Sequence, residues 1–193
     1  MNTAPPRGLF TGVRPTVEEI ARELPGDELV PNPDVVMDRA FTLPGHAADV
    51  WPWFLQLGKR RAGWYLTTAL ERAIPRSRRA LRRIDPKLTQ LRVGDVIPDW
   101  GGRNATFEVV RVEPPAALVY GSTRGSVKLS WAIVLGDGGS SEEPTTRVQL
   151  RLRLSPVRRL WLARSAGALV DLLTVAGLAS GLRERLEHRG RHR

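Results

Sequence analysis

Hydrophobic residues alternate with polar ones along the second half of the chain, a period of two that is typical of strands. The alternation is most regular over residues 127–135 and 145–154, which predict strands with one apolar and one solvated face. Shorter stretches of similar composition predict strands at 93–97, 107–113 and 117–122. Because only short loops rich in proline, glycine or polar residues separate these stretches, we expect an antiparallel meander.

The first half of the chain and its C-terminal region follow other patterns. Residues 35–43 predict a strand, and 47–57 predict a helix in which Pro52 removes one backbone donor and favours a kink or a late start. A capping box predicts a short helix from 68 to 74. A long apolar helix is expected after Pro156.

Part of this last helix, residues 160–182, is apolar enough to suggest a membrane span. It contains Arg164 and Asp171 on one helical face, where a bilayer would oppose each charge by about 2.5–3.5 kcal/mol. We therefore interpret it as a buried helix of a soluble protein. The first thirty residues are acidic and lack the apolar run of an export signal, so we expect a cytoplasmic protein.

The net charge of +10 arises from 30 lysines and arginines against 20 acidic residues, and only three of these cations are lysines. A preference for arginine along a whole chain is typical of GC-rich genomes. The excess is concentrated in residues 59–92, where eleven cations accompany two carboxylates. Within this region, residues 77–84 predict a short helix with four arginines on one face, and these are Arg78, Arg79, Arg82 and Arg83.

Three interpretations of this arginine-rich helix remain open. The simplest is a solvated charged face. The second is peripheral docking on the anionic inner surface of the membrane, where each arginine contributes about 1 kcal/mol. The third is nucleic-acid binding, but the region has neither interleaved aromatic residues nor a recognition motif, which argues against it.

The order of the expected elements is that of an α+β protein. A strand and helices precede a run of antiparallel strands, and the long C-terminal helix is expected to cover the apolar face of the sheet. A cavity forms between them if the sheet curves around the helix. We divide the chain into an acidic N-terminal extension (1–34), one core domain (35–187) and a basic tail (188–193).

Four strings in the core domain carry a resemblance to a known superfamily. They are VVMDRAFTL at 35–43, DVWPWFLQLG at 49–58, RAGWY at 61–65 and LRVGDVIP at 91–98. Together they resemble a bacterial branch of the SRPBCC superfamily, the START-like, Bet v 1-like, polyketide cyclase and lipid-transport group. The resemblance covers residues 24–186 and implies a helix-grip fold, in which a curved antiparallel sheet wraps around the C-terminal helix.

The resemblance also implies a tunnel for a lipid, sterol, polyketide or other apolar molecule, without choosing between carriers, receptors and enzymes. The arginine-rich helix at 77–84 departs from the branch. Six tryptophans make aromatic residues the main candidates for the cavity wall, although core packing also explains buried indoles. The cavity candidates are Trp53, Arg61, Trp64, Tyr65, Trp100, Tyr120, Trp131, Leu150 and Leu173.

Several kinds of site are excluded or disfavoured by composition. The chain has no cysteine, which excludes disulfides, thiol nucleophiles and cysteine-based metal sites. Its histidines, His46, His188 and His192, are not at metal-ligand spacing, and no nucleotide-binding motif is present. We therefore expect neither a metal nor a cofactor.

Arg61 has two interpretations. As a binding residue it would recognise an acidic ligand group at the mouth of the cavity. As a structural residue it would pair with Glu71 or Asp95 beside a turn at Gly63.

Three functions follow as alternatives. The first is non-catalytic binding, with or without transport, of a small hydrophobic molecule such as a lipid or a polyketide-like compound. The second is a cyclase or dehydratase, in which Asp38, Glu71 or Asp95 enolises the substrate while Arg61 or Tyr120 stabilises the oxyanion. The third is a basic surface-binding protein without a ligand cavity, which a space below about 300 Å³ would favour.

Overall fold

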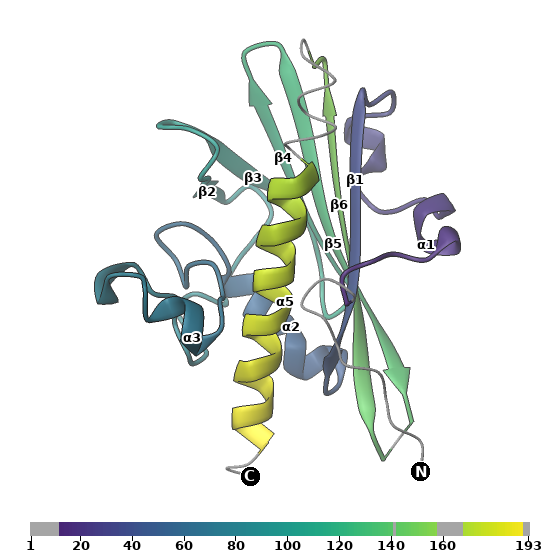
Figure 1. The fold of residues 1–193 in the computed structure, drawn as a ribbon. Helices are drawn as coiled ribbons and strands as arrows, with labels where there is room; N and C mark the ends of the chain where they lie inside the picture. The colour runs from purple at the N-terminus through teal and green to yellow at the C-terminus, as the bar shows by residue number, and fades with distance from the viewer. Residues whose placement is uncertain (1–11, 141, 158–167, 191–193) are drawn as a thin grey trace.

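The fold is built on a six-stranded antiparallel sheet with the strand order β1-β6-β5-β4-β3-β2 (Figure 1). It is seen in a computed structural model that describes residues 12–140, 142–157 and 168–190. The α+β class and the antiparallel meander predicted from the sequence are confirmed. The strands are β1 (Val35–Pro44), β2 (Val96–Pro98), β3 (Thr106–Glu113), β4 (Ala117–Arg124), β5 (Val127–Gly139) and β6 (Pro144–Ser155).

The strand bounds agree with the alternation to within a few residues, except at β2. The prediction placed this strand at 93–97, but it begins only at Val96. The preceding residues form a turn instead, in which Gly94 has a φ of 90° and the Asp95 carboxylate accepts a hydrogen bond from the Arg92 N–H at 2.8 Å. The alternation of apolar residues does not reveal this side-chain cap, which ends the extended conformation locally.

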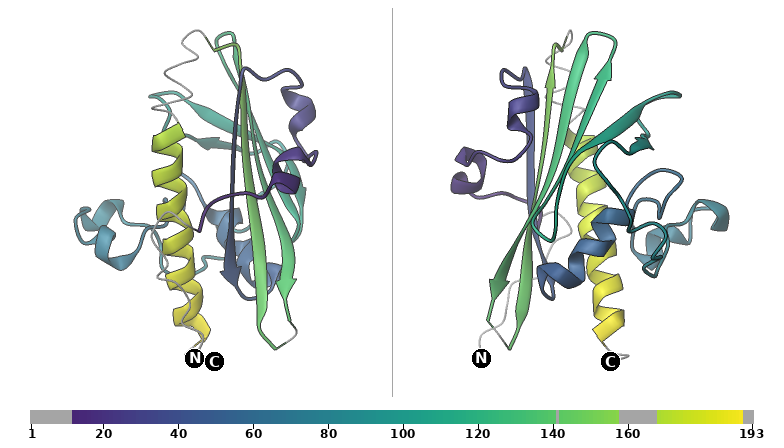
Figure 2. Two further views of the ribbon diagram at one scale, coloured as in Figure 1. Left: turned by 45° about the vertical axis from the view of Figure 1, so that its right-hand side comes forward. Right: turned by 180° about the vertical axis from the view of Figure 1, so that it is seen from behind.

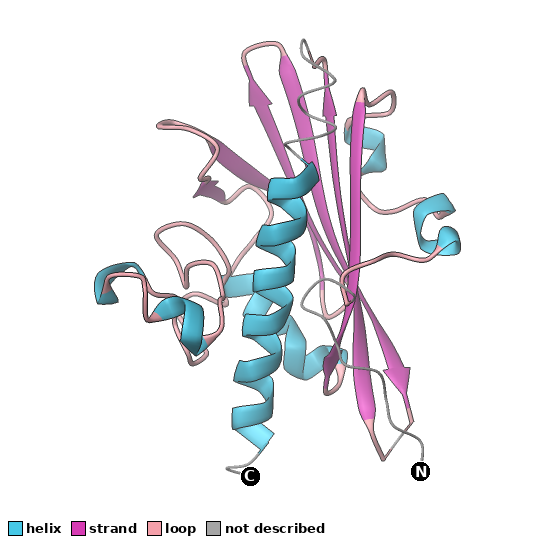
Figure 3. Ribbon diagram, viewed as in Figure 1, coloured by secondary structure: helices cyan, strands magenta, loops and turns pink. Residues whose placement is uncertain are grey.

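Helices lie on both sides of the sheet (Figure 3). The longest, α5 (Ala168–Gly190), crosses the apolar face, and α2 (Ala47–Gln56), which has Pro52 inside it, packs on the same side. The shorter helices are α1 (Val17–Ala21), η1 (Asp27–Leu29), α3 (Thr68–Glu71) and η2 (Arg76–Arg78). The helix expected after Pro156 includes residues 158–167, which lie outside the described residues. No helix in the described ranges is long and apolar enough to cross a bilayer.

The core lies between α5, α2 and the inner face of the sheet. Inner-face residues of neighbouring strands stand opposite each other, as Phe41 does with Val148, and both are fully buried. Helix α5 contributes a buried stripe at the spacing of a helix face, formed by Val175, Leu178, Ala179 and Leu182. The apolar face predicted from the alternation is thus the face that α5 covers.

The outer face of the sheet is partly covered as well, by a segment that we call the N-terminal strap (residues 12–34). Figure 2 shows α1 on the opposite side of the sheet from α5. Arg151, on the outer face of β6, is only 4% exposed and forms ion pairs with Asp27 of the strap and Asp38 of β1, at 2.8 and 2.7 Å. The expectation of a fully solvated outer face was therefore wrong at these positions.

The strap is attached to the sheet through backbone as well as side-chain groups. The guanidinium of Arg151 also donates to the carbonyl oxygens of Ile20 and Arg22, each at 2.8 Å. Burial alone would lower the pKa of Arg151, but the two carboxylates outweigh it and raise that pKa. Arg151 occupies a polar position of the alternating pattern, yet it is buried and holds the strap on the sheet instead of facing solvent.

The helix predicted at 77–84 is not formed. The structure has the 3-10 turn η2 at 76–78 and irregular chain after it, and α3 ends at Glu71 instead of residue 74. Ala80 packs against the backbone of Gly63, and the Leu81 N–H donates to the Ala62 carbonyl at 2.8 Å. These tertiary contacts hold the chain extended where its local pattern predicts a helix.

Candidate functional site

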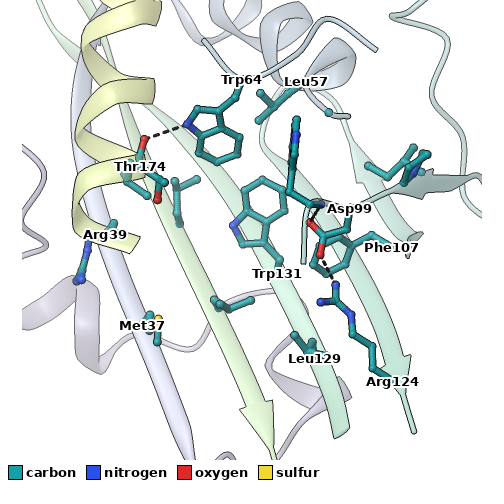
Figure 4. Close-up of a pocket in the computed structure, with 17 residues that line it drawn as sticks. Met37, Arg39, Leu57, Trp64, Asp99, Phe107, Arg124, Leu129, Trp131 and Thr174 are labelled. Atoms are coloured by element: carbon teal, nitrogen blue, oxygen red, sulfur yellow. Dashed lines mark hydrogen bonds and ion pairs between the residues drawn. The ribbon is translucent and has the colours of Figure 1, made fainter. Parts of the chain in front are cut away.

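A cavity of about 230 Å³ lies between α5 and the inner face of the sheet, beside the loop from β2 to β3. Figure 4 shows side chains from β1, β5, α5 and the loops around it converging on this space. Its wall is mostly apolar, with contributions from all six strands of the sheet and from α5. The aliphatic lining residues are Met37, Leu57, Ile97, Leu129, Leu150, Leu152 and Val175.

Four aromatic side chains form one side of the cavity. Trp64 stacks on Trp131 with ring centroids 6.3 Å apart, and the half-exposed Trp100 meets Trp64 edge-on at 5.7 Å. Phe107 contacts Trp131 at 6.0 Å. Aromatic contacts at these separations fix ring orientation and add about 0.5–1.5 kcal/mol each beyond burial. The wall is therefore a connected group of rings that presents flat apolar surface to the cavity.

Glycine geometry positions Trp64 in this wall. The chain between Gly58 and Gly63 forms a closed loop, with the Gly63 N–H donating to the Gly58 carbonyl at 3.0 Å. Gly63 has a φ of 87°, and a Cβ atom there would lie 3.0 Å from the Cα of Ala80, so no larger residue fits without strain. The Trp64 indole then donates to the Thr174 carbonyl of α5 at 3.0 Å, which ties the wall to the helix.

An ion pair stands at the sheet side of the cavity. The Arg124 guanidinium donates to the Asp99 carboxylate at 2.5 Å and lies over the Phe107 ring, 5.1 Å from its centroid. The same carboxylate accepts from the backbone N–H groups of Trp100 and Gly101, at 2.7 and 3.1 Å. Asp99 thereby holds the loop that carries Trp100, and its hydrogen-bonding capacity is largely used within the protein.

Arg39 and Thr174 are the remaining polar side chains among the described lining residues. Arg39 lies on the inner face of β1, and its guanidinium donates to the Asp38 carbonyl at 2.8 Å. The cavity is thus an apolar space with few polar groups, most of which have intramolecular partners.

Arg61 does not line the cavity in the described structure. Its guanidinium donates to the backbone carbonyls of Leu55 and Leu88, at 3.0 and 2.5 Å. Neither Glu71 nor Asp95, the partners considered from the sequence, is bound by it: in the described structure each makes other contacts. The geometry corresponds to a residue that fastens two loops together.

Three aromatic candidates lie in the core outside the cavity lining. Trp53 and Tyr65 meet edge-on at 5.4 Å, and the Tyr65 hydroxyl donates to the Trp53 carbonyl at 2.9 Å. Tyr120 stacks on Trp131, with ring centroids 5.5 Å apart. Burial raises the pKa of both tyrosines above the ordinary value of 10, because the phenolate would be desolvated. Both hydroxyls are therefore neutral at physiological pH.

The carboxylates considered for catalysis are all outside the described cavity lining. Asp38 is on the outer face of the sheet with Arg151, and Asp95 is exposed in the turn before β2. Glu71 is buried beside α5, where it pairs with Arg185 at 2.6 Å and with Arg82 at 3.0 Å. No group of His, Asp and Glu side chains among the described residues could hold a metal ion.

Four of the nine cavity candidates therefore meet at the cavity, namely Trp64, Trp100, Trp131 and Leu150. Leu173 is on α5 but points away from the lining and is 48% exposed. Sequence reasoning missed Leu129 and Leu152, although each is two positions from a candidate on the same strand face. It also missed Arg124, Asp99 and Thr174, for which the sequence contains no comparable signal.

Comparison with known proteins supports the fold and gives no family. No family model matches the chain, and no curated protein matches it. A hypothetical protein of Helicobacter pylori, jhp0584, has a similar structure, with a TM-score of 0.50, 14% sequence identity and coverage of 84% of this chain and 94% of that one. Protein CV1439 from Chromobacterium violaceum follows at 0.46, with 14% identity and coverage of 77% and 97%. At such identities the likeness is one of fold alone, an α+β protein with an antiparallel sheet and a C-terminal helix.

Proposed function

We propose that the protein has a helix-grip fold of the SRPBCC type and binds a small hydrophobic molecule in the cavity between α5 and the sheet. The observation that carries the proposal is the aromatic wall formed by Trp64, Trp100 and Trp131. Ligand sites are typically concave and apolar, with a few placed polar groups, and this cavity has that composition. Half of the Trp100 surface is accessible, which leaves a large apolar side chain available at the mouth.

The volume limits the size of the ligand. The cavity of about 230 Å³ is smaller than the roughly 300 Å³ at which ordinary ligand pockets begin, which taken alone favours the alternative of a protein without a ligand cavity. A dry apolar cavity of about 150 Å³ nevertheless binds benzene. The space therefore suits a compact molecule of one or two rings better than a long-chain lipid.

The wall supports binding rather than catalysis. A cyclase would need an acid or base within reach of the substrate, and Asp99 is the one carboxylate among the described lining residues. Its oxygens accept hydrogen bonds from Arg124 and from two backbone N–H groups, so much of its hydrogen-bonding capacity is used within the protein. We therefore assign the cavity a carrier or sensor function.

Tryptophan fluorescence tests the proposal, because the wall itself is the reporter. Naphthalene, 2-naphthol and palmitate are titrated into the wild-type protein, and we expect the two-ring compounds to quench its fluorescence saturably. Leu152→Trp fills the cavity, whereas Leu154→Trp adds the same side chain two residues further along the strand, outside the lining. Loss of binding in the first variant and retention in the second are expected.

Two results would contradict the proposal. One is the absence of saturable quenching by any of the three compounds, and the other is undiminished binding by Leu152→Trp. Native mass spectrometry of the protein purified from its own host, followed by denaturing extraction, then identifies any molecule that the cavity retains.

A further inference from the structure

A second surface of the molecule has properties that the cavity does not explain. We call residues 66–92 the arginine arm, and its part with α3 lies on the other side of α5 from strands β1, β5 and β6 (Figures 1 and 2). The arm includes α3 and η2 and contains eight cations and two carboxylates.

The arm is fixed to α5 by a buried polar cluster. The Arg185 guanidinium, which has no exposed side-chain surface, binds Glu71 at 2.6 Å, and the Thr68 N–H donates to Glu184 at 2.9 Å. Burial opposes the ionisation of Glu184, but hydrogen bonds from Thr68 and Arg82 outweigh it and lower its pKa. The arm therefore has a defined position on the body of the protein.

The same cluster pairs one of the two carboxylates of the arm with arginines. Glu71 is buried between Arg82 and Arg185, and the Asp85 carboxylate is half-buried and accepts the Lys87 N–H at 3.0 Å. Two of the four arginines singled out in the sequence bind other groups of the protein. Arg82 binds Glu71 and Glu184, and Arg79 donates to the carbonyls of Ile74 and Arg72.

The outer surface of the arm is left with cations and small apolar groups. Within the described part of the chain, six exposed arginines of the arm have no carboxylate within 4.0 Å, and these are Arg72, Arg76, Arg78, Arg79, Arg83 and Arg92. Leu70, at 48% exposure, lies among them with the exposed Ala73 and Pro75. A cationic surface with a shallow apolar component is complementary to the headgroup region of an anionic bilayer.

We propose that the arginine arm docks the protein on anionic lipid membranes. Nucleic acid fits the surface less well for two reasons. Entry into a DNA groove takes a helix or a two-stranded ribbon, whereas α3 has four residues and η2 has three. Single strands are held by stacking on aromatic side chains, and residues 66–92 contain none. The proposal does not depend on the cavity binding a ligand.

The expected effect follows from the charge that is removed. Each arginine near an anionic membrane surface strengthens binding about fivefold at moderate ionic strength. The triple variant Arg72→Gln, Arg76→Gln and Arg78→Gln should therefore lose about a hundredfold in vesicle affinity. It leaves the cluster of Glu71, Arg185 and Glu184 intact, so the fold is retained.

Co-sedimentation with vesicles provides the test. The full-length protein is mixed with vesicles of phosphatidylcholine alone or with added phosphatidylglycerol, and we expect binding to the anionic vesicles only, weakened by salt. A control triple variant, Arg14→Gln, Arg103→Gln and Lys128→Gln, removes the same charge from exposed positions outside the arm. It should bind nearly as wild type does.

Three outcomes would overturn the proposal. They are binding that does not depend on phosphatidylglycerol, equal losses in the two triple variants, and tighter binding to a DNA duplex or a single strand than to the vesicles. Naphthalene titration of the arm variant separates this test from that of the cavity, because cavity binding should be unchanged.

Discussion

Replacement of Arg185 by methionine should destabilise the protein more than any replacement of an exposed arginine. The Arg185 guanidinium donates to Glu71 and to the carbonyls of Leu66, Gly181 and Leu81, at 2.6–3.0 Å. Burial lowers its pKa, which shows that the environment penalises the charge that these partners stabilise. Methionine has a similar length and none of the donors.

The expected loss of stability follows from the burial of both Arg185 and Glu71. Removing one member of a buried ion pair costs about 3–5 kcal/mol, because the other charge is left uncompensated. Arg82 binds the same carboxylate, but its side chain is 39% exposed. Because Arg185 still pairs with Glu71 when the half-exposed Arg82 is replaced, Arg82→Met should cost only about 1 kcal/mol.

Urea denaturation followed by far-ultraviolet circular dichroism measures both variants. Typical domains have a free energy of unfolding of about 5–15 kcal/mol, so the Arg185→Met loss should move the midpoint strongly. A loss below about 1 kcal/mol, or equal losses in Arg185→Met and Arg82→Met, would show that the buried cluster does not carry the stability argued for it.

Two further predictions concern the loop before Trp64 and the N-terminal strap. Gly63→Ala should cost about 1–3 kcal/mol, because alanine at a φ of 87° is strained and its Cβ would press on Ala80. Gly94→Ala, at a φ of 90° in open space, should cost less, and equal midpoints in urea would refute the clash. Arg147 holds the pKa of Glu19 below its ordinary value of 4.5, so this stabilisation is present at neutral pH and is lost as pH falls below that value. Limited proteolysis should therefore release the strap in acid, and the stability difference between wild type and Glu19→Gln should vanish there; a difference that persists in acid would contradict the assignment.

The sheet could be predicted from the sequence because the residues of each strand carry their own pattern of alternating apolar and polar side chains. Alternation of apolar and polar residues over 127–135 and 145–154 places β5 and β6 to within a few residues, and it identifies the face that α5 covers. The same alternation could not identify Arg151 as buried. Its partners Asp27 and Asp38 are more than a hundred residues away in sequence, and polarity alone does not reveal them.

The candidate site was predictable to a lesser extent. The RAGWY string and the apolar face of β5 point to Trp64 and Trp131, but the sequence does not separate these from Trp53 and Tyr65, which are packed one layer further in. That distinction depends on the closed loop at Gly63, which orients two neighbouring aromatic residues to different environments. The prediction of an arginine-rich helix at 77–84 was wrong, because contacts with Gly63 and α5 outweigh the local helix propensity.

The pairing of β1 with β6 affects how the chain can fold while it is being synthesised. The first strand of the sheet to leave the ribosome hydrogen-bonds to the last one, from Val35 with Leu154 to Pro44 with Thr145. The strap, made earlier still, finds its anchor Arg151 on that same last strand. Because α1 has only five residues, too few for a stable isolated helix, the strap has no structure to adopt until then. Strand β1 and the strap therefore cannot take their places in the fold until residue 155 has emerged, so the sheet closes only after its last strand is made.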